Sequence, residues 1–510
     1  MAGFSVNSHC GKIYKFSYHT KVGCGMSDKV SYPLKHMPKT KIVCTLGPST
    51  EDEGILKELI LTGMNVARIN MSHGTLATHT KILELVRSVS HSLGIPVGVM
   101  VDVPGTKYRT GPLNVGVVNL EDGDKITLTS EDITGDSNRV SVSPPGIHID
   151  AEIGGTILVD DGNIELGVDE ISGPDVTCRV VRGARLTERR GVVTPGKSPT
   201  QDFPDEKAIE CLKFAAQNNA DFVALSTVTK MEDIDKARDV LRAAGMTSPY
   251  IISKVERAEA VENIQEIVDG SDALMVARGD MGVEVPLKRV PIIQKDLIKR
   301  SNSAGKPVIT ATQMLESMIN ASSPTRAEVT DVANAVFDGT DAIMLSGETS
   351  IGKFPVAAVR VMVETASEAE KALPYESMMR ERHLQLKSEP DDAISFAACQ
   401  TANELNSKLI VAFTESGSSA GRVSRYRPKA RIIALTPWPQ VEKRLTLRWA
   451  VFPLIVKDLE NVEDFFSIGE FQASKILGES TEGTVVLVGG TPIGVPGSTN
   501  LLRILKLKQN

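Results

Sequence analysis

The sequence has no long apolar segment, few aromatic residues and no excess of positive charge. No apolar stretch among its 510 residues approaches the length of a membrane helix, which needs roughly 18 consecutive apolar residues. Aromatic residues make up only 4%, which argues against a stacking platform for single-stranded nucleic acid. The formal net charge of −7 provides no general basic surface for a polyanion. We therefore expect a protein that binds neither membranes nor nucleic acids.

The sequence also lacks the cysteine pattern of a disulfide framework or a zinc site. Its six cysteines include no CxxC pair and show no regular spacing. Such usage is typical of a reducing compartment, and we expect a cytoplasmic protein. The first 27 residues contain neither Asp nor Glu, but they also lack Arg and a clear apolar core, so they match no transit or secretory peptide. We interpret residues 1–38 as a mobile N-terminal extension.

Eight short apolar segments dominate the first part of the chain. Most are separated by segments of helical character, such as EDEGILKELILTG at 51–63. Near-continuous apolar strands that alternate with helices are typical of parallel strands covered on both faces. Eight such units predict an α/β fold, the (β/α)8 TIM barrel. The eight segments are residues 41–47, 64–70, 97–103, 220–227, 250–256, 272–279, 307–313 and 341–347.

The spacing of these segments predicts how the chain divides into domains. Residues 106–202 interrupt the barrel after its third strand, and their alternating pattern with DG and GG turns predicts an inserted all-β cap domain. The barrel then consists of residues 39–105 and 203–372. Residues 373–392 are polar with prolines near both ends, which is typical of a linker. Residues 393–510 are predicted to form a C-terminal α/β domain with four strands, at KLIVAFTE, ARIIALTP, VFPLIV and TVVLVGG.

Reactive side chains follow the apolar segments at their C-terminal ends, the face where barrel enzymes carry their chemistry. Lys254 and Glu256 lie on the same face of one strand, and Asp280 follows the next strand. One interpretation is a buried salt bridge between Lys254 and a carboxylate. The other is a divalent cation held by Glu256 and Asp280 beside an anionic, phosphorylated substrate. Polar side chains at the ends of the other strands favour the second interpretation.

The first two apolar segments supply further candidates. Arg68 ends the second segment, and a guanidinium group there suits a phosphate through paired charge-assisted hydrogen bonds. Asn70 and Ser72 follow it and offer oxygen ligands or hydrogen bonds. His73 alone is better explained as an ordinary loop histidine. Thr45, at the end of the first segment, could contact a phosphate, but many βα loops look alike.

The loops after the last three barrel strands add smaller candidates. Gly279 would let backbone N–H groups approach an anion closely. Thr312 could bond a substrate carboxylate or enol oxygen. Ser346 and Glu348 end the eighth segment, where they could relay protons or only orient Lys254.

Several long motifs resemble the pyruvate kinase family, and they occur in the same order. They are MNVARINMSHG, IISKVE, LMVARGDMGVEV, ITATQMLESM, PTRAEVTDVANAVFDGTDAIMLSGETSIGKFP and FTESGSSAGRVSRYRPKARIIALT. The resemblance extends from about Lys39 to the C-terminus. It implies a cytoplasmic enzyme of glycolysis that transfers phosphate from phosphoenolpyruvate to ADP, giving pyruvate and ATP. It also implies a homotetramer, the usual assembly of the family.

The resemblance implies roles for individual residues. Arg68 and Lys254 would hold the transferring phosphoryl group, and Glu256 and Asp280 would hold the Mg²⁺ that binds phosphoenolpyruvate. A second Mg²⁺ would arrive with ADP. Thr312, Ser346 and water are candidates for protonating the enolate. The substrate carboxylate would be received by Gly279, Asp280 and Thr312. The nucleotide would be bordered by Thr45, Asn70, Ser72, His73, Arg109 and Arg190.

The loop after the third strand departs from the family pattern. Potassium-dependent members carry Glu where this chain has Lys107. An ammonium group there would supply the charge that K⁺ otherwise provides, while Asn70, Ser72, Asp102 and Val103 keep the geometry of the former ion site. We therefore expect a dependence on Mg²⁺ but no requirement for K⁺. An exposed loop lysine without such a role is the alternative.

A hydroxyl-rich loop precedes a predicted helix in the C-terminal domain. Hydroxyl and N–H groups at the start of a helix favour a phosphate, and the family uses this loop for phosphorylated effectors. We expect a sugar-phosphate or nucleotide effector, with plain helix capping as the alternative. Glu415 stands where some regulated members carry Lys, which disfavours fructose bisphosphate as the ligand. The loop residues concerned are Thr414, Ser416, Gly417, Ser418 and Ser419.

The residues alone leave two alternative functions open. A barrel lyase or aldolase that uses Mg²⁺ with a 2-oxo acid would share the Glu256 and Asp280 pair. Such an enzyme would not need Arg68, Lys254 and a nucleotide-facing cap together. The other alternative is a catalytically retired regulatory homologue, against which the retention of all these residues argues.

Overall fold

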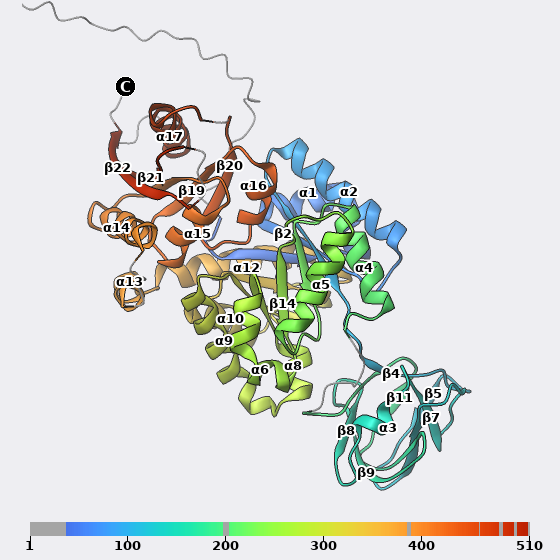
Figure 1. Cartoon of the computed structure of the whole chain (residues 1–510). Coiled ribbons are helices and arrows are strands. Elements are labelled where there is room, and N and C mark those ends of the chain that lie inside the picture. The colour runs from blue at the N-terminus through green and yellow to red at the C-terminus, as the bar shows by residue number, and fades with distance from the viewer. Residues whose placement is uncertain are drawn as a thin grey trace, which may run out of the picture.

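The computed structural model describes residues 37–196, 203–384, 389–457, 459–478, 483–493 and 497–507. Most of the expected N-terminal extension, residues 1–36, lies outside these ranges. Figure 1 shows a central barrel with the cap at one end and the C-terminal domain at the other. In the described ranges, no helix is both long and apolar enough to cross a membrane.

The central barrel is a closed sheet of eight parallel strands, as the sequence predicts. Strand β1 pairs with β2 on one side and with β17 on the other, which closes the sheet. Nearly every strand residue is buried, because helices cover the outside and side chains fill the inside. The strands are β1 (Lys41–Thr45), β2 (Met64–Asn70), β3 (Gly98–Val103), β13 (Phe222–Leu225), β14 (Ile251–Val255), β15 (Ala273–Ala277), β16 (Val308–Ala311) and β17 (Ala342–Leu345).

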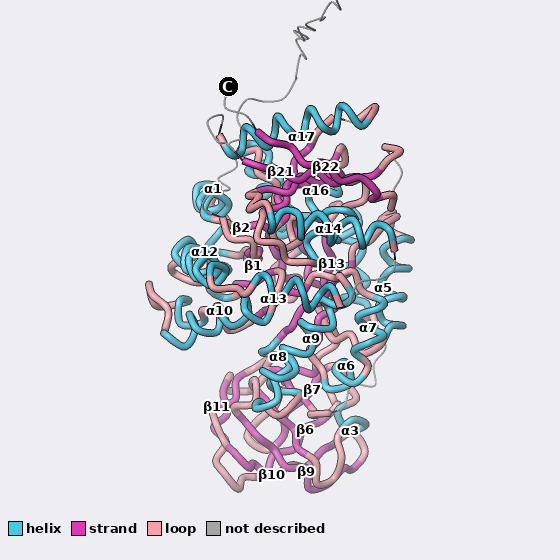
Figure 2. Tube along the Cα trace, turned by 90° about the vertical axis from the view of Figure 1, so that its left-hand side faces the viewer, coloured by secondary structure: helices cyan, strands magenta, loops and turns pink. Residues whose placement is uncertain are grey.

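Helices surround this barrel, and local sequence signals set their ends. Asp205 caps one helix by accepting a hydrogen bond from the Ala208 amide, and Asp52 caps another in the same way. Figure 2 shows the helices enclosing the barrel strands, whereas the cap is almost entirely strand and loop. The helices are α1 (Glu53–Thr62), α2 (Leu76–Leu93), α4 (Glu206–Gln217), α5 (Met231–Ala243), α6 (Ala258–Glu262), α7 (Ile264–Gly270), α8 (Arg278–Glu284), α9 (Val290–Ala304), α10 (Arg326–Asp338), α11 (Gly347–Ser350) and α12 (Pro355–Lys371).

The inserted cap is a second, smaller closed barrel of antiparallel and parallel pairs with its own apolar core. It leaves the main barrel after β3, where Tyr108 is buried and donates a 2.5 Å hydrogen bond to Asp150. The predicted all-β insertion is therefore confirmed. Its elements are β4 (Tyr108–Thr110), β5 (Val117–Asn119), β6 (Lys125–Thr129), β7 (Arg139–Ser143), α3 (Ile147–Asp150), β8 (Thr156–Val159), β9 (Ile164–Ser172), β10 (Asp175–Arg182), β11 (Arg185–Thr187) and β12 (Gly191–Val193).

The C-terminal domain is a five-stranded sheet in the order β20-β19-β18-β21-β22, with helices packed on it. The four strands read from the sequence are present, and a fifth, β22, pairs antiparallel with β21 at the edge. The elements are α14 (Pro390–Glu404), β18 (Leu409–Phe413), α15 (Ser418–Arg425), β19 (Arg431–Thr436), α16 (Pro439–Leu445), β20 (Val451–Ile455), α17 (Val462–Leu477), β21 (Gly483–Gly490) and β22 (Thr499–Leu507).

The segments that join the barrel to this domain are more ordered than the sequence suggests. Residues 373–392, expected to be a linker, contain helix α13 (Tyr375–His383) and the first turn of α14. Met37, placed in the extension by the sequence, is buried among the apolar side chains of the C-terminal sheet. The barrel and the C-terminal domain also share an ion pair, in which Arg427 Nη1 lies 2.8 Å from Asp341 Oδ1.

Candidate active site

Three charged side chains meet at the C-terminal rim of the barrel. Arg68 comes from β2, Asp102 from β3 and Lys254 from β14. Arg68 Nε lies 2.7 Å from Asp102 Oδ2, and Lys254 Nζ lies 3.2 Å from Asp102 Oδ1. None of the three side chains is more than 10% exposed. Asp102 therefore holds a guanidinium group and an ammonium group side by side, where they can act on one anion.

The ion pairs of this network override the effect of burial. Burial alone would raise the pKa of Asp102, but Lys254 and Arg68 hold that pKa below its usual range. Burial would likewise lower the pKa of Lys254, but Asp102 and Glu256 raise it. Both groups consequently keep their charges at neutral pH.

Two hydroxyl groups fix the directions of the cations. Thr45 Oγ1 accepts a 2.7 Å hydrogen bond from Arg68 Nη1 and donates a 2.9 Å one to the Leu345 carbonyl. Ser226 Oγ accepts a 2.7 Å hydrogen bond from Lys254 Nζ and lies 3.3 Å from Asp102 Oδ1. Thr45, expected beside the nucleotide, is instead buried and used within the barrel, where it positions Arg68.

The sequence alone assigns no role to Ser226. Its signal was its place directly after the apolar segment that forms β13. Sequence position alone could not show that its hydroxyl lies between Lys254 and Asp102, because the three residues come from different strands.

Glu256 and Asp280 converge on one cation. Lys107 Nζ hydrogen-bonds to Asp280 Oδ1 and lies 3.9 Å from Glu256 Oε2. The other oxygen, Glu256 Oε1, forms an ion pair with Lys254 Nζ at 2.8 Å, although without hydrogen-bond geometry. The buried salt bridge read from the sequence is thus present. The same two carboxylates also reach a single positive charge, which is the arrangement that a divalent cation needs.

These residues fit a magnesium ion. In the described ranges, no group of three or more His, Cys, Asp or Glu side chains gathers in a way that could hold a metal. Two carboxylates are nevertheless sufficient for Mg²⁺, which keeps several waters and commonly takes its other ligands from substrate phosphates.

Lys107 lies in a different place from the one expected. Its ammonium group contacts the two carboxylates rather than Asn70, Ser72 or Asp102. Burial would lower its pKa, but Glu256 and Asp280 outweigh burial and raise it. Burial would raise the pKa of Asp280, but Lys107 and Lys254 lower it.

The residues of the expected monovalent-cation site are adjacent. Asn70 lies opposite Asp102 in the β2–β3 register, and the Asn70 side chain accepts a 3.2 Å hydrogen bond from the Ser72 amide. The Asp102 carbonyl accepts another from the Met71 amide. Val103 ends β3 directly beside them.

Gly279 and Thr312 are brought together at the rim. The Gly279 amide donates a 2.8 Å hydrogen bond to Thr312 Oγ1, which donates a 2.6 Å one to the Ala311 carbonyl. Thr312 and Gln313 adopt positive φ angles of 66° and 53°, which are uncommon for residues other than glycine. Backbone strain of this kind collects at functional sites, and here it turns a hydroxyl group toward an N–H donor.

Ser346 and Glu348 act separately from Lys254. Glu348 is fully buried and accepts hydrogen bonds from the Ser346 amide at 2.7 Å and the Leu315 amide at 3.0 Å. It therefore holds the loops that follow β16 and β17, and it does not orient Lys254. Within the described residues, the buried Ser346 hydroxyl has no hydrogen-bond partner.

The nucleotide candidates form two groups. Asn70 ends β2 on the barrel and Ser72 and His73 follow it, whereas Arg109 and Arg190 belong to the cap. Arg109 Nη1 donates to the Arg189 carbonyl at 3.1 Å, and Arg190 Nη1 lies 3.2 Å from Asp160 Oδ1. The contacts of both arginines thus lie within the cap.

A cavity of about 60 Å³ between the cap and the barrel contains a residue that sequence reasoning missed. Burial raises the pKa of Glu284 to about 7, although Arg257 and Lys107 oppose the shift. Arg257 Nη2 donates a 3.0 Å hydrogen bond to the Thr106 carbonyl at the start of the cap. Glu284 lies within the LMVARGDMGVEV motif, which was its only signal.

The hydroxyl-rich loop of the C-terminal domain is tightly bonded within itself. The Gly417 amide donates to Thr414 Oγ1 at 2.9 Å, and the hydroxyls of Ser416 and Ser418 lie 3.1 Å apart. The Ser419 hydroxyl lies 2.6 Å from that of Thr499, and Trp438 Nε1 donates to Glu415 at 2.5 Å. A cavity of only about 20 Å³ is lined by Thr414, Glu415, Ser416, Ser418, Ser419 and Thr499, among others.

Two family models match the chain. The pyruvate kinase barrel domain matches residues 37–359, and the pyruvate kinase alpha/beta domain matches residues 392–505. The chain belongs to the pyruvate kinase family. This confirms the family, the fold class and the phosphotransferase class predicted from the sequence, and it gives no support to a lyase, an aldolase or a retired homologue.

Curated relatives agree over most of the chain. It is 41% identical to the pyruvate kinase of Clostridium acetobutylicum, covering 92% of this chain and 99% of that protein. It is also 41% identical to the pyruvate kinase of Clostridium perfringens, over 92% of this chain and all of that one. For the pyruvate kinase of Staphylococcus saprophyticus the identity is 40%, over 92% of this chain and 80% of that protein.

Proposed function

We propose that the rim of the barrel transfers the phosphoryl group of phosphoenolpyruvate to ADP, giving pyruvate and ATP. The observation that carries this proposal is the convergence of Arg68, Lys254, Glu256 and Asp280 on one rim. Phosphoryl transfer needs positioning and charge neutralisation rather than a strong nucleophile from the protein. Two fixed cations and a pair of carboxylates that can hold a metal provide both.

Arg68 and Lys254 are proposed to bind the phosphoryl group. Asp102, Thr45 and Ser226 already hold these two cations, so little reorganisation is needed when charge shifts during transfer. Gly279, Asp280 and Thr312 are proposed to receive the substrate carboxylate, through the Gly279 amide, the Thr312 hydroxyl and a metal beside Asp280.

Glu256 and Asp280 are proposed to hold Mg²⁺ where they now contact Lys107. Bound there, the ion would act as a Lewis acid and neutralise phosphate and carboxylate oxygens. For the proton that the enolate takes up, Thr312, Ser346 and water remain the proposed sources. The buried Ser346 hydroxyl has no partner within the described residues, which leaves it free to donate.

The nucleotide is proposed to lie between the barrel and the cap. Asn70, Ser72 and His73 would contact it from the barrel, and Arg109 and Arg190 from the cap. Because the two groups belong to different domains, closure of the cap over the substrate would assemble the site and exclude water.

We also propose that K⁺ is not required, for a reason that includes the observed position of Lys107. When a divalent cation takes Glu256 and Asp280, the displaced ammonium group would move toward Asn70, Ser72 and Asp102. It would supply the positive charge there. Lys254 already contacts both Asp102 and Glu256, so the two positions are close.

A steady-state assay with phosphoenolpyruvate and ADP tests both proposals. We expect ATP and pyruvate in equal amounts, and nearly full activity when Na⁺ or tetramethylammonium replaces K⁺. A large stimulation by K⁺ would refute potassium independence but would leave the proposed phosphoryl transfer intact. A carbon–carbon cleavage assay with 2-oxo acids should give no product.

The C-terminal loop from Thr414 to Ser419 is proposed to bind a phosphorylated effector. Its hydroxyl groups precede helix α15, but the cavity is small and Glu415 is held by Trp438. An effector would therefore have to open the loop. If no phosphorylated metabolite shifts the phosphoenolpyruvate saturation curve, this proposal fails. A cytoplasmic homotetramer also remains a proposal, and sedimentation of the purified protein would test its assembly.

A further inference from the structure

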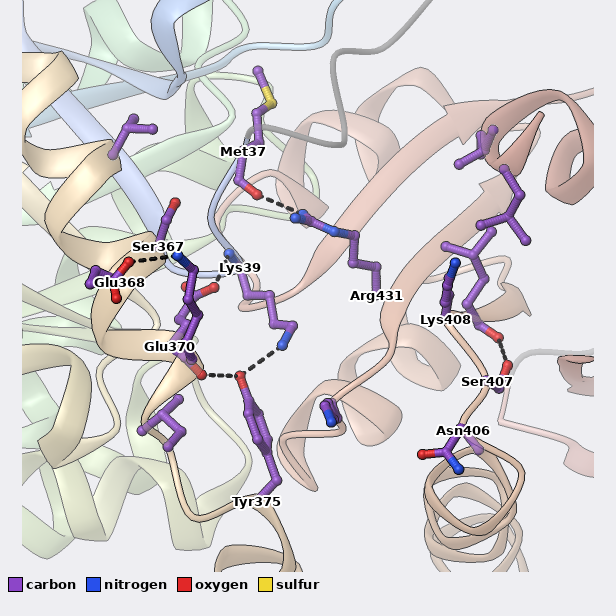
Figure 3. A pocket seen from close by; sticks show the side chains of 18 of the residues that line it. Met37, Lys39, Ser367, Glu368, Glu370, Tyr375, Asn406, Ser407, Lys408 and Arg431 are labelled. Carbon is purple, nitrogen blue, oxygen red and sulfur yellow. Dashed lines mark hydrogen bonds and ion pairs between the residues drawn. The ribbon is translucent and has the colours of Figure 1, made fainter. Parts of the chain in front are cut away.

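A large cavity lies away from the catalytic rim, between the barrel and the C-terminal domain (Figure 3). Its volume is about 1380 Å³. Residues of α12 and the segment just before β1 form one side, and the ends of α14 and α17 with the start of β19 form the other. We refer to it as the interdomain cleft. Neither the catalytic residues nor the effector loop contribute to it.

Positive charge is in excess along this cleft. The carboxylates that line it are Glu364, Glu368 and Glu370. The cationic side chains that line it are Lys39, Arg360, Lys371, Lys408, Lys429 and Arg431. Both domains contribute cations, so the excess charge spans the boundary between them.

Two of the three carboxylates are already engaged. Glu368 forms an ion pair with Lys371 at 2.6 Å. Glu370 accepts hydrogen bonds from the Lys39 amide at 2.9 Å and from the amide and hydroxyl of Thr40 at 2.7 and 2.9 Å. Glu370 thus satisfies backbone groups at the start of β1 and does not form an ion pair with the Lys39 ammonium group.

Lys39 is a buried cation without a carboxylate partner in the described part of the chain. The residue is 9% exposed, and its ammonium group donates a 2.7 Å hydrogen bond to the Tyr375 hydroxyl. The same group lies 4.4 Å from the centre of the Tyr375 ring (Figure 3). Burial lowers the pKa of Lys39 to about 8, and Arg431 and Lys429 lower it further while Glu370 opposes them.

Cations without a matching carboxylate also lie elsewhere along the cleft, on both of its sides. Arg431 donates a 2.6 Å hydrogen bond to the Met37 carbonyl, a neutral group, and burial lowers its pKa. Arg360, Lys408 and Lys429 form no ion pair within the described residues and are exposed at the mouth of the cleft. An uncompensated charge that is partly withdrawn from water is costly, and an anion would remove that cost.

The leading segment of the chain has the wrong charge to fill the cleft. Residues 1–36 precede Met37, which lines it, and they contain five lysines and one aspartate with no arginine or glutamate. Such a segment would add to the positive charge. A separate anion is therefore the better match.

We propose that the interdomain cleft binds a small organic anion with at least two negative charges, either a phosphate ester or a polycarboxylate. Lys39 would contact it from the barrel, and Arg431, Lys408 and Lys429 from the C-terminal domain. The anion would tie the segment just before β1 to the C-terminal sheet. Because Thr45 at the other end of β1 holds Arg68, the cleft is linked to the catalytic rim by a single strand.

The test is a double charge reversal, Lys408→Glu with Lys429→Glu. Both side chains are exposed and have no ion-pair partner among the described residues, so the fold should be unaffected. The matched control is Lys57→Glu with Lys81→Glu, which makes the same change of charge at exposed positions on α1 and α2. Calorimetric titration with inorganic pyrophosphate and with citrate compares the two sources of negative charge.

Wild type should bind at least one of these anions at a site that the double variant weakens tenfold or more and the control leaves unchanged. Hydrogen exchange on saturation should slow at the amides of residues 39–41 and 429–433, which locates the site. Turnover without added anion should be equal in all three proteins. Equal affinity in the double variant, or protection confined to the catalytic rim or the effector loop, would overturn the proposal.

Discussion

The catalytic rim and the interdomain cleft both bring Lys and Arg side chains together, but they treat the charges in opposite ways. At the rim, Lys254 lies within 3.2 Å of both Asp102 and Glu256, and these carboxylates raise its pKa. In the cleft, Lys39 meets a hydroxyl group and an aromatic ring, and its pKa falls to about 8. The rim is thus balanced before a ligand arrives, whereas the cleft is not.

This difference separates two uses of buried positive charge. The balanced network at the rim fixes the directions of Arg68 and Lys254, which suits the stabilisation of a transition state. The unbalanced cleft gains most when an anion binds, which suits ligand sensing. Changes at the rim should therefore affect turnover, whereas changes in the cleft should affect ligand binding and the pH dependence of stability.

The largest effect is expected from Lys254→Met. It removes the ammonium group that contacts Asp102 and Glu256. The value of kcat should therefore fall about 10³-fold or more, because the transition state loses an electrostatic group that stabilises it. Lys299→Met, on the exposed side of α9, is the control and should keep wild-type kcat. A residual kcat within tenfold of wild type would remove Lys254 from the mechanism.

Asp102→Asn should come next. It leaves Arg68 and Lys254 buried beside a neutral amide, so the free energy of unfolding should fall by about 3 kcal/mol. The two cations should also lose their fixed directions, and a displacement of this kind costs about 100-fold in turnover. Urea denaturation and kcat measure the two effects. An unchanged free energy of unfolding would show that Asp102 does not stabilise the ion pairs with Arg68 and Lys254.

Lys107→Met should improve metal binding to the free protein. Its ammonium group competes for Glu256 and Asp280, so calorimetry without substrate should show a Mg²⁺ affinity about tenfold higher in the variant. Lys288→Met, at an exposed position near α9, should leave the affinity unchanged. The variant should also acquire a requirement for K⁺ in the steady-state assay. Equal Mg²⁺ affinity in wild type and variant would refute the competition.

The smallest effect concerns the pH dependence of stability. The pKa of Lys39 is about 8 in the folded chain and near 10.5 when exposed, so the unfolded state binds more protons between these pH values. Unfolding free energy should therefore gain a rising contribution from pH 8 to 10, on the order of 1 kcal/mol, that Lys39→Met lacks. The difference between the two proteins isolates this group from the other lysines. Parallel curves would place Lys39 in water.

The sequence was most informative where burial sets the pattern. Each barrel strand is buried on both faces, so it appears as a continuous apolar segment, and the parallel arrangement fixes which end carries the reactive residues. This is why Arg68, Lys254, Glu256 and Asp280 could be assigned to one rim. Strand β22 was missed because it lies at a sheet edge with many exposed side chains.

The directions of the side chains could not be predicted from the sequence. Thr45 appeared to face a nucleotide, but the carbonyl of Leu345 and the guanidinium group of Arg68 use its hydroxyl. Lys107 appeared to face Asp102, but the carboxylate of Asp280 in helix α8 attracts it. The interdomain cleft could not be predicted, because Lys39 and Tyr375, which meet in it, are 336 residues apart in the chain. Such contacts depend on packing between distant segments.

Manganese binding followed by electron paramagnetic resonance tests the central claim most directly, because it counts metal ions without relying on turnover. We predict one tightly bound Mn²⁺ for each wild-type chain without substrate. The double variant Glu256→Gln with Asp280→Asn should leave the ion in solution at the same concentrations. If this variant retains its fold and still binds Mn²⁺ with wild-type stoichiometry and affinity, the two carboxylates do not hold the metal.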